Sequence, residues 1–205
     1  TAYEISTRDW SSDVCSSDLA AAGMVVSELP WVWMRPHTQT LNGLVKFDGA
    51  EYFESGMRAG SGVIIMSPHI GSWEIGAQAI AEKFGPEFGD MVVLFRPARK
   101  PWLESLVANA RTRPFLNSTP TTMSGVRTLM RTLRAGGYTA ILPDQVPPMG
   151  QGVWAPFFGR DVYTMTLLAK LAQQTGAQVI ETWCERLPIG QGFCLHIDRK
   201  STRLN

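Results

Sequence analysis

The sequence is poor in the residues that bind metals or form disulfides. It has three histidines and three cysteines in 205 residues, and the cysteines show no C-x-x-C spacing. Neither H-E-x-x-H nor the paired cysteines of a structural zinc site occur. An odd number of cysteines fits a reducing compartment better than a disulfide scaffold. We therefore expect no metal in the site of this protein.

Long apolar runs are also missing. No stretch approaches the roughly 18 to 20 apolar residues of a membrane span, and the candidate near the start, LAAAGMVV, is too short. No basic segment precedes it, as a signal peptide would require. The composition, with 44% hydrophobic and 18% charged residues, instead suits one ordinary globular domain with a substantial core.

The motifs of several large enzyme classes are absent. No G-x-S-x-G elbow is present, so Ser72 is not expected to act as a nucleophile of the α/β-hydrolase kind. The chain also has no P-loop and no G-x-G-x-x-G fingerprint, which argues against a nucleotide site. A site without these features would use the side chains of the protein alone, and we expect no cofactor.

Charge is balanced over the whole chain but unevenly distributed. A formal net charge of +1 gives no argument for nucleic acid as a partner. The stretch from Met91 to Pro143 nevertheless has eight basic residues and a single acid, Glu104. This surplus suits phosphate groups or an acidic protein surface, although solvated helix faces would explain it equally well. The basic residues are Arg96, Arg99, Lys100, Arg111, Arg113, Arg127, Arg131 and Arg134.

Predicted strands and helices alternate along the chain. Apolar runs bounded by glycine and proline predict strands at 43–49, 62–68, 90–97, 138–145, 177–187 and 192–198. Helical spacing of apolar residues predicts helices at 50–60, 72–85, 100–113, 125–137 and 164–176. This alternation is typical of an α/β sandwich with a central, mostly parallel sheet flanked by helices. The last two strands are close enough to form an antiparallel hairpin.

Polar residues stand where three of these predicted strands end. His69 follows VIIMSP, Arg96 follows MVVLF, and Asp144 follows TAILP. In an open α/β sheet, the ligand crevice lies at the carboxyl ends of the strands. We therefore expect these three side chains to contribute to one site.

His69 and Glu74 form a candidate catalytic pair. They are five residues apart, which on a continuous helix would place them about 140° apart. A turn from strand to helix removes that obstacle, because Pro68 favours an extended conformation before it and Gly71 allows a sharp bend. Glu74 would then orient His69 as a general base. Glu74 also has a structural interpretation, since acids in a first helical turn interact favourably with the helix dipole.

Four segments in order carry a family resemblance. They are PHIGSWE, VVLFRPARKPWLESLV, LRAGGYTAILPDQ and GVWAPFFGRDVYTMTLLAKLAQQTGAQVI. Together they resemble the bacterial lipid A biosynthesis acyltransferases, the lauroyl and myristoyl transferases of lipopolysaccharide assembly. The resemblance covers nearly all of residues 28–197, and it implies a fold like that of the glycerolipid acyltransferases.

The resemblance also implies a reaction. His69 would deprotonate a hydroxyl of the acceptor while Glu74 orients the imidazole and stabilises its protonated form. The donor would be an acyl-acyl-carrier protein and the acceptor a phosphorylated glycolipid, a lipid A precursor. The location implied is the cytoplasmic face of the inner membrane. No metal, cofactor or nucleic acid takes part in this scheme.

Further site residues follow from the same resemblance. Arg96 would bind phosphate or offset charge in the tetrahedral intermediate. Asp144 matches a second acidic motif, with Gln145 beside it as a polar contact. The turn at 157–159 and Thr164 would shape the site. The other expected substrate-binding residues, for lipid phosphates or an acidic carrier protein, are Arg99, Lys100, Arg111 and Arg113.

Some features depart from the family pattern. Many members have asparagine where Ser72 stands, and the family's N-terminal anchor helix and C-terminal region rich in tryptophan and arginine are not found here. The segments 1–19 and 200–205 resemble translated adapter sequence. We therefore expect a single acyltransferase domain at 20–199 that is truncated on both sides.

Other functions stay open at this point. The family resemblance extends to transferases that acylate other glycolipids, such as a phosphatidylinositol mannoside. A non-catalytic domain that binds lipid or acyl-carrier protein, or a hydrolase resembling a thioesterase, would use the same fold.

Overall fold

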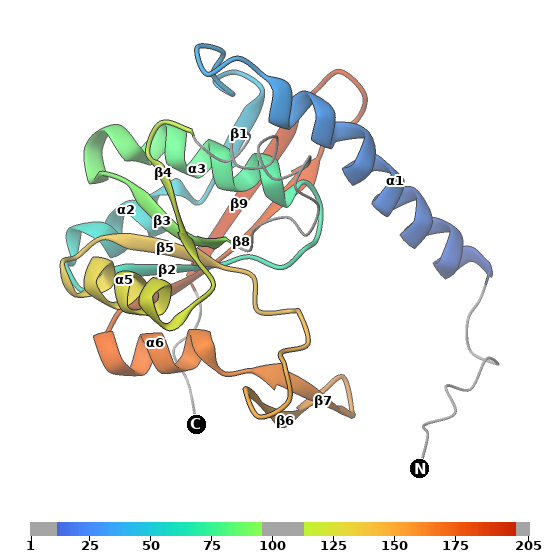
Figure 1. Cartoon of the computed structure of the whole chain (residues 1–205). Coiled ribbons are helices and arrows are strands. Elements are labelled where there is room, and N and C mark those ends of the chain that lie inside the picture. The colour runs from blue at the N-terminus through green and yellow to red at the C-terminus, as the bar shows by residue number, and fades with distance from the viewer. Residues whose placement is uncertain (1–11, 96–112, 200–205) are drawn as a thin grey trace.

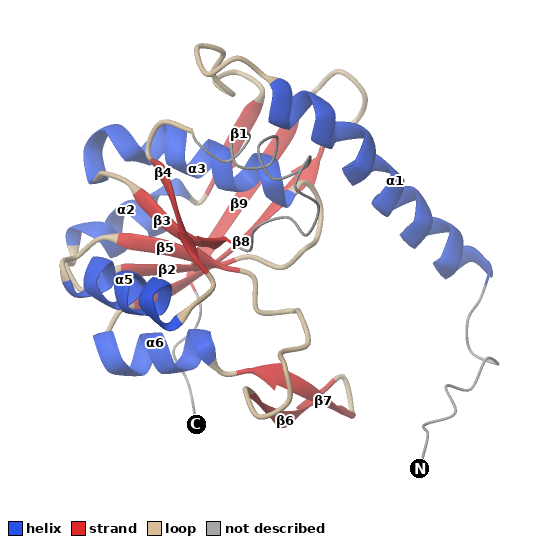
Figure 2. Cartoon of the chain, in the orientation of Figure 1, coloured by secondary structure: helices blue, strands red, loops and turns tan. Residues whose placement is uncertain are grey.

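The computed structural model describes residues 12–95 and 113–199, which form a central sheet of seven strands with helices on both faces (Figures 1 and 2). The sheet strands are β1 (Val45–Asp48), β2 (Val63–Met66), β3 (Met91–Phe95), β4 (Leu116–Pro120), β5 (Tyr138–Ile141), β8 (Gln178–Arg186) and β9 (Phe193–Arg199). The helices are α1 (Ser12–Met34), α2 (Ala50–Arg58), α3 (Trp73–Phe88), α5 (Met123–Arg134) and α6 (Leu167–Thr175). A separate hairpin is formed by β6 (Gly152–Phe157) and β7 (Arg160–Met165).

The sheet is mostly parallel, in the order β1-β9-β8-β2-β5-β3-β4. Strands β8, β2, β5, β3 and β4 run in one direction, whereas β9 runs antiparallel to β8 and β1 runs parallel to β9. This arrangement confirms the predicted α/β sandwich. It also confirms the predicted hairpin of the last two strands, and β1 lies at one edge of the sheet.

The central strand β2 is buried on both faces. Because side chains alternate along a strand, Val63 and Ile65 belong to one core cluster and Ile64 belongs to the other. Burial on both faces explains why this strand is a continuous apolar run without alternation.

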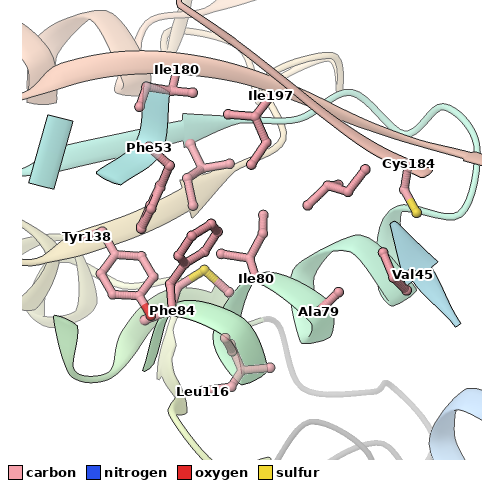
Figure 3. Close-up of a cluster of buried hydrophobic side chains, with 14 of the residues drawn as sticks. Val45, Phe53, Ala79, Ile80, Phe84, Leu116, Tyr138, Ile180, Cys184 and Ile197 are labelled. Carbon is pink, nitrogen blue, oxygen red and sulfur yellow. The ribbon is translucent and has the colours of Figure 1, made fainter. Parts of the chain in front are cut away.

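The first core cluster lies between the sheet and helices α2 and α3. Figure 3 shows Ala79, Ile80 and Phe84 of α3 facing the sheet, where Ile180 of β8 and Ile197 of β9 lie. The Phe53 ring of α2 packs on Phe84 with 4.3 Å between ring centroids. The cluster therefore fixes α3, whose first turn carries Glu74, against the sheet.

The second core cluster lies under helices α5 and α6, on the opposite face (Figure 2). Leu129 and Leu133 of α5 are fully buried, together with Leu171 of α6. The arginines of α5 point the other way and are exposed, as the amphipathic pattern predicts. For Arg127, Arg131 and Arg134, the structure thus agrees with solvated helix faces.

Several boundaries differ from the sequence predictions. Helix α3 continues past Gly85 to Phe88, because Phe88 packs on Phe53 and the left-handed break comes at Gly89 instead. Helix α6 begins at Leu167, since Thr164 belongs to strand β7. Helix α1, strand β4 and the β6–β7 hairpin were not predicted. The helix expected at 100–113 lies outside the described residues except for its last residue.

Within the part of the chain that the structure describes, no helix combines the length and apolar character needed to cross a membrane. Helix α1 is the longest at 23 residues. Its C-terminal end reaches the first core cluster through Val32, while its N-terminal turns extend away from the sheet (Figure 1).

Candidate functional site

His69 and Asp144 meet where two neighbouring strands end. Strands β2 and β5 pair in register from Val63 to Met66, and Ser67 N–H continues the ladder to the Ile141 carbonyl at 3.1 Å. The segments that follow β2 and β5 therefore leave the sheet side by side. The backbone N–H of His69 donates to Asp144 Oδ2 at 2.7 Å, and His69 Nδ1 lies 2.7 Å from Asp144 Oδ1.

The Asp144 carboxylate fixes the state of the imidazole. Burial tends to raise the pKa of Asp144, but the His69 backbone N–H and imidazole together outweigh this and hold the pKa below its ordinary value. An ionised carboxylate only accepts hydrogen bonds, so Nδ1 carries the proton. Nε2 is then the basic nitrogen, and the Gln145 amide Nε2 lies 3.3 Å from it.

The turn after His69 is held by strand β8. Gly71 has φ of 67°, and a Cβ atom at this position would lie 2.0 Å from the Cys184 carbonyl oxygen. The next residue, Ser72, donates its N–H to that same oxygen at 2.8 Å. Only glycine permits this close approach without strain. The turn that carries His69 is thus attached to β8 on one side and to Asp144 on the other.

The Ser72 hydroxyl serves a structural contact. It donates to Glu28 Oε2 at 2.6 Å, and Glu28 also accepts hydrogen bonds from Arg186 Nε at 2.5 Å and Nη2 at 2.9 Å. Ser72 is almost fully buried. This small network joins α1, the end of β8 and the His69 turn, and it engages the hydroxyl of Ser72.

His69 lies at a cavity of about 620 Å³ with a mostly apolar wall. The ring of Trp73 packs edge-on against the imidazole with 5.0 Å between centroids. Glu74, in the first turn of α3, is 8% exposed and lines the same cavity. Gln145 adds another polar group, and the apolar wall includes Ala77, Val93, Leu94, Leu142, Met165 and Leu167. The cavity combines a basic nitrogen with walls suited to hydrocarbon.

Comparison with known proteins identifies the family of this chain. A family model described as bacterial lipid A biosynthesis acyltransferase matches residues 11–200. The chain belongs to this family. No curated protein matches the chain. Membership makes the protein an acyltransferase of lipid A biosynthesis, an enzyme with an acyl donor and a lipid acceptor.

The basic residues predicted to bind substrate fall into two groups in this lipid A acyltransferase. Arg96, Arg99, Lys100 and Arg111 lie outside the described residues. Arg113 is 5% exposed. Its guanidinium donates to carbonyl oxygens at the C-terminal end of α1, those of Arg35 at 2.8 Å, Val32 at 2.9 Å and Trp33 at 3.4 Å.

Arg113 therefore has a structural placement, whereas the sequence led us to expect contact with lipid phosphates or an acidic carrier protein. Burial, and then the nearby charge of Arg35, lower the pKa of Arg113. Four carbonyl groups at a helix C-terminus lack partners within the helix, and a guanidinium satisfies several of them at once. This contact attaches α1 to the start of the β4 segment.

The turn at 157–159 also differs from expectation. We expected it to shape the site, but Phe157 and Phe158 are exposed and do not line the cavity. Thr164 hydrogen-bonds locally to the Val162 carbonyl at 3.2 Å. From strand β7, it is Met165 that lines the cavity.

Sequence reasoning expected Asp144 at this edge of the sheet and gave the orienting role to Glu74. In the structure, Asp144 is the carboxylate that contacts His69 Nδ1. One signal was available: Pro68 and Pro143 directly precede His69 and Asp144, so both strands end in the same way. The apolar wall was missed, since Trp73, Met165 and Leu167 come from separate elements. Among the described residues, no group of three or more His, Cys, Asp or Glu side chains is arranged to hold a metal ion.

Proposed function

We propose that this protein is an O-acyltransferase that moves a fatty acyl chain from acyl-acyl-carrier protein to a hydroxyl of a lipid A precursor. The reaction would take place at the cytoplasmic face of the inner membrane, in lipopolysaccharide biosynthesis. The observation that carries the proposal is the His69–Asp144 pair at the apolar cavity. Family membership supports the classes of donor and acceptor.

In the proposed mechanism, His69 Nε2 takes the proton of the acceptor hydroxyl as the oxygen attacks the thioester carbonyl carbon. The tetrahedral intermediate then collapses, the carbon–sulfur bond breaks, and the departing thiolate takes the proton back from His69. Asp144 holds Nδ1–H and stabilises the imidazolium formed between these two steps. No protein nucleophile is needed, which fits the engaged hydroxyl of Ser72.

The two remaining polar groups of the cavity receive roles that follow from their positions. Gln145 would occupy Nε2 of His69 in the resting enzyme and give way to the acceptor hydroxyl. Glu74 brings a second carboxylate to the same cavity, where negative charge favours the imidazolium. The contact at Nδ1 supports Asp144, in preference to Glu74, as the orienting residue.

The cationic residues expected from the sequence complete the proposal. Arg96 would stabilise the oxyanion or hold a phosphate of the acceptor, a contribution that preorganised charge can make worth several kcal/mol. Arg99, Lys100 and Arg111 would contact lipid phosphates or the acidic carrier protein. The resemblance of their segment to the family is the basis for these assignments.

Lipid A mass spectrometry in a strain that lacks its own late acyltransferase tests the proposal. The wild-type gene is expected to add the mass of one acyl chain to lipid A, and His69→Ala is expected to abolish the addition while circular dichroism shows a folded protein. His37→Ala is the matched control, because His37 is an exposed histidine outside the cavity. Full acylation by His69→Ala would refute the mechanism. A mass increase on another glycolipid, such as a phosphatidylinositol mannoside, would redirect the acceptor.

A further inference from the structure

The β6–β7 hairpin and the loop before it expose an unusual amount of apolar surface. We call this surface the hairpin patch; its exposed large apolar residues are Val146, Met149, Val153, Trp154, Phe157, Phe158 and Val162. Phe158 is 93% exposed, Trp154 66% and Phe157 61%. Val153 and Phe157 lie on one face of the hairpin and Trp154 lies on the other. Exposed apolar surface of this extent marks a site of contact with a protein or a membrane.

The hairpin does not bury these side chains against the rest of the molecule. It stands beside α6, apart from the central sheet (Figures 1 and 2), and it forms a two-stranded sheet of its own. Phe157 and Arg160 are the last residue pair before the turn. Two-stranded sheets are at best marginally stable alone in water, so contact with another surface would stabilise this one.

The turn itself favours the display of an aromatic ring. Phe158 has φ of 48° and Gly159 has φ of 76°, the left-handed pair that hairpins usually fill with Asn-Gly. A bulky residue is unfavourable in this conformation. Folding of the hairpin alone therefore does not explain Phe158. The ring packs edge-on against Phe157, with 4.7 Å between centroids, and both are held at the tip.

The base of the hairpin is joined to the cavity. The Tyr163 hydroxyl accepts hydrogen bonds from Gly150 N–H at 2.8 Å and Gly152 N–H at 3.0 Å, which fix the incoming loop. That loop begins just after Gln145, and β7 ends at Met165; both of these residues line the cavity. The segment that carries the hairpin patch is therefore flanked at both of its ends by residues that line the cavity.

We infer that the hairpin patch inserts into the surface of a lipid bilayer and holds the cavity mouth beside it. Trp and Phe rings favour the interfacial region of a membrane. An acidic protein such as a carrier protein fits less well, because residues 146–165 contain only one cation, Arg160, beside one acid, Asp161. Under the proposed function, a lipid acceptor would enter the cavity from the bilayer. The purpose of the membrane contact therefore rests on the proposed function, whereas the contact itself does not.

Cosedimentation with vesicles of phosphatidylethanolamine and phosphatidylglycerol tests the inference with the whole chain. The double variant Phe157→Ser, Phe158→Ser is expected to bind at least about tenfold more weakly, since two aromatic rings lose their burial in lipid. Tyr52→Ser is the matched control: Tyr52 is an exposed aromatic on α2, outside the patch, and this variant is expected to bind like the wild type.

A second variant separates binding from folding. Asparagine suits the left-handed φ of residue 158, so Phe158→Asn is expected to raise the thermal unfolding midpoint and still weaken vesicle binding. Quenching of tryptophan fluorescence by brominated lipids tests whether Trp154 enters the bilayer. The wild type should lose more fluorescence on binding than Trp154→Phe, because six of the seven tryptophans are shared by both chains.

Three results would overturn the inference. The first is vesicle binding by the double variant that equals that of the wild type. The second is a change in oligomeric state in Phe158→Asn, measured by light scattering, with binding unchanged, which would make the patch an interface between copies. The third is a double variant that loses binding to acyl-carrier protein while its vesicle binding stays unchanged. Failure of the proposed function looks different, since no lipid is acylated while vesicle binding still depends on the hairpin.

Discussion

At the scale of single residues, the site depends on a contact between positions 75 apart in the chain. His69 ends one strand and Asp144 ends its neighbour, so their contact follows from the pairing of β2 and β5. The spacing of His69 and Glu74 suggested a local pair instead. Glu74 does reach the same cavity, and in the proposed mechanism the two carboxylates would have separate tasks.

Exchange of each carboxylate for its amide distinguishes these tasks. Asp144→Asn is expected to lower kcat by about 10²- to 10⁴-fold. An amide no longer keeps the proton of His69 on Nδ1, so Nε2 is no longer held as the basic nitrogen. Glu74→Gln is expected to lower kcat less, since it removes a negative charge but leaves the hydrogen bond between Asp144 and His69 Nδ1 intact. Acyl transfer to a lipid A precursor in detergent measures both. A greater loss in Glu74→Gln than in Asp144→Asn would return the orienting role to Glu74.

His196 predicts a component of stability that depends on pH. Its Nε2 lies 2.9 Å from Glu185 Oε2 and its Nδ1 lies 3.0 Å from Asp48 Oδ2, and the ring stacks on Trp183. The hydrogen bond with Glu185 raises the pKa of His196 above 6.5; burial opposes this, and Asp48 adds to the increase.

Because the pKa is higher in the folded protein than in the unfolded chain, this stabilisation is fully present below about pH 6.5. It is lost as the pH rises through the folded pKa. Urea unfolding of the wild type and His196→Gln should therefore differ most at acidic pH and converge at alkaline pH. His37→Gln serves as control, and a difference that grows with pH would contradict the assignment.

At the scale of elements, loops attached to the sheet position the chemistry. The His69 turn contacts β8 through Gly71 and Ser72, and α1 is attached through Ser72 and through Arg113. The geometry of each group makes its contact possible: glycine allows the close backbone approach, and the guanidinium donates to several carbonyl oxygens at once. The basic stretch seen in the sequence thus includes at least one residue, Arg113, with a structural task.

Two glycines with similar positive φ angles allow this turn to be tested. Gly71 and Gly60 have φ of 67° and 76°, but a Cβ atom meets the Cys184 carbonyl at Gly71 and nothing within 4 Å at Gly60. Gly60→Ala is expected to cost about 1 kcal/mol from backbone conformation alone. Gly71→Ala adds a clash with backbone and is expected to cost about 3 kcal/mol or more. Urea unfolding measures both, and equal losses would argue against the tight contact.

At the scale of the whole molecule, two cores on opposite faces of one sheet share the stability. The cavity lies at the carboxyl edge, where side chains from both layers reach it: Ala77 from α3 and Leu167 from α6. The β6–β7 hairpin continues from that same edge. Proposed catalysis and proposed membrane contact therefore meet on one side of the protein.

The second core should contribute to stability without taking part in chemistry. Leu129→Ala removes a fully buried side chain under α5 and is expected to cost about 2 to 5 kcal/mol. Acyl transfer measured well below the unfolding midpoint should stay near the wild-type rate, because Leu129 does not line the cavity. Arg131→Ala, on the exposed face of the same helix, is the control. A large loss of activity at a temperature where the variant is folded would contradict this division.

Much of the fold could be predicted from local sequence because buried strands and amphipathic helices have their own periods. The run at 62–68 and the amphipathic stretch at 125–137 were both assigned correctly. The β6–β7 hairpin was missed because its strands are exposed on both faces and contain Pro156, so the alternation of a half-buried strand is absent. Strand β4, with the sequence LNSTP, is equally weak in apolar residues.

The fold class and the edge of the sheet where polar groups gather could be predicted from the sequence, because strand ends and glycine or proline boundaries are local signals. The sequence also carried the ordered motifs of the acyltransferase family. Three features became visible only in the folded structure: Asp144 contacts His69 Nδ1, Arg113 binds the C-terminal end of α1, and Phe158 is exposed at a hairpin tip. These outcomes depend on strand pairing and packing between distant segments, and no spacing along the chain encodes them.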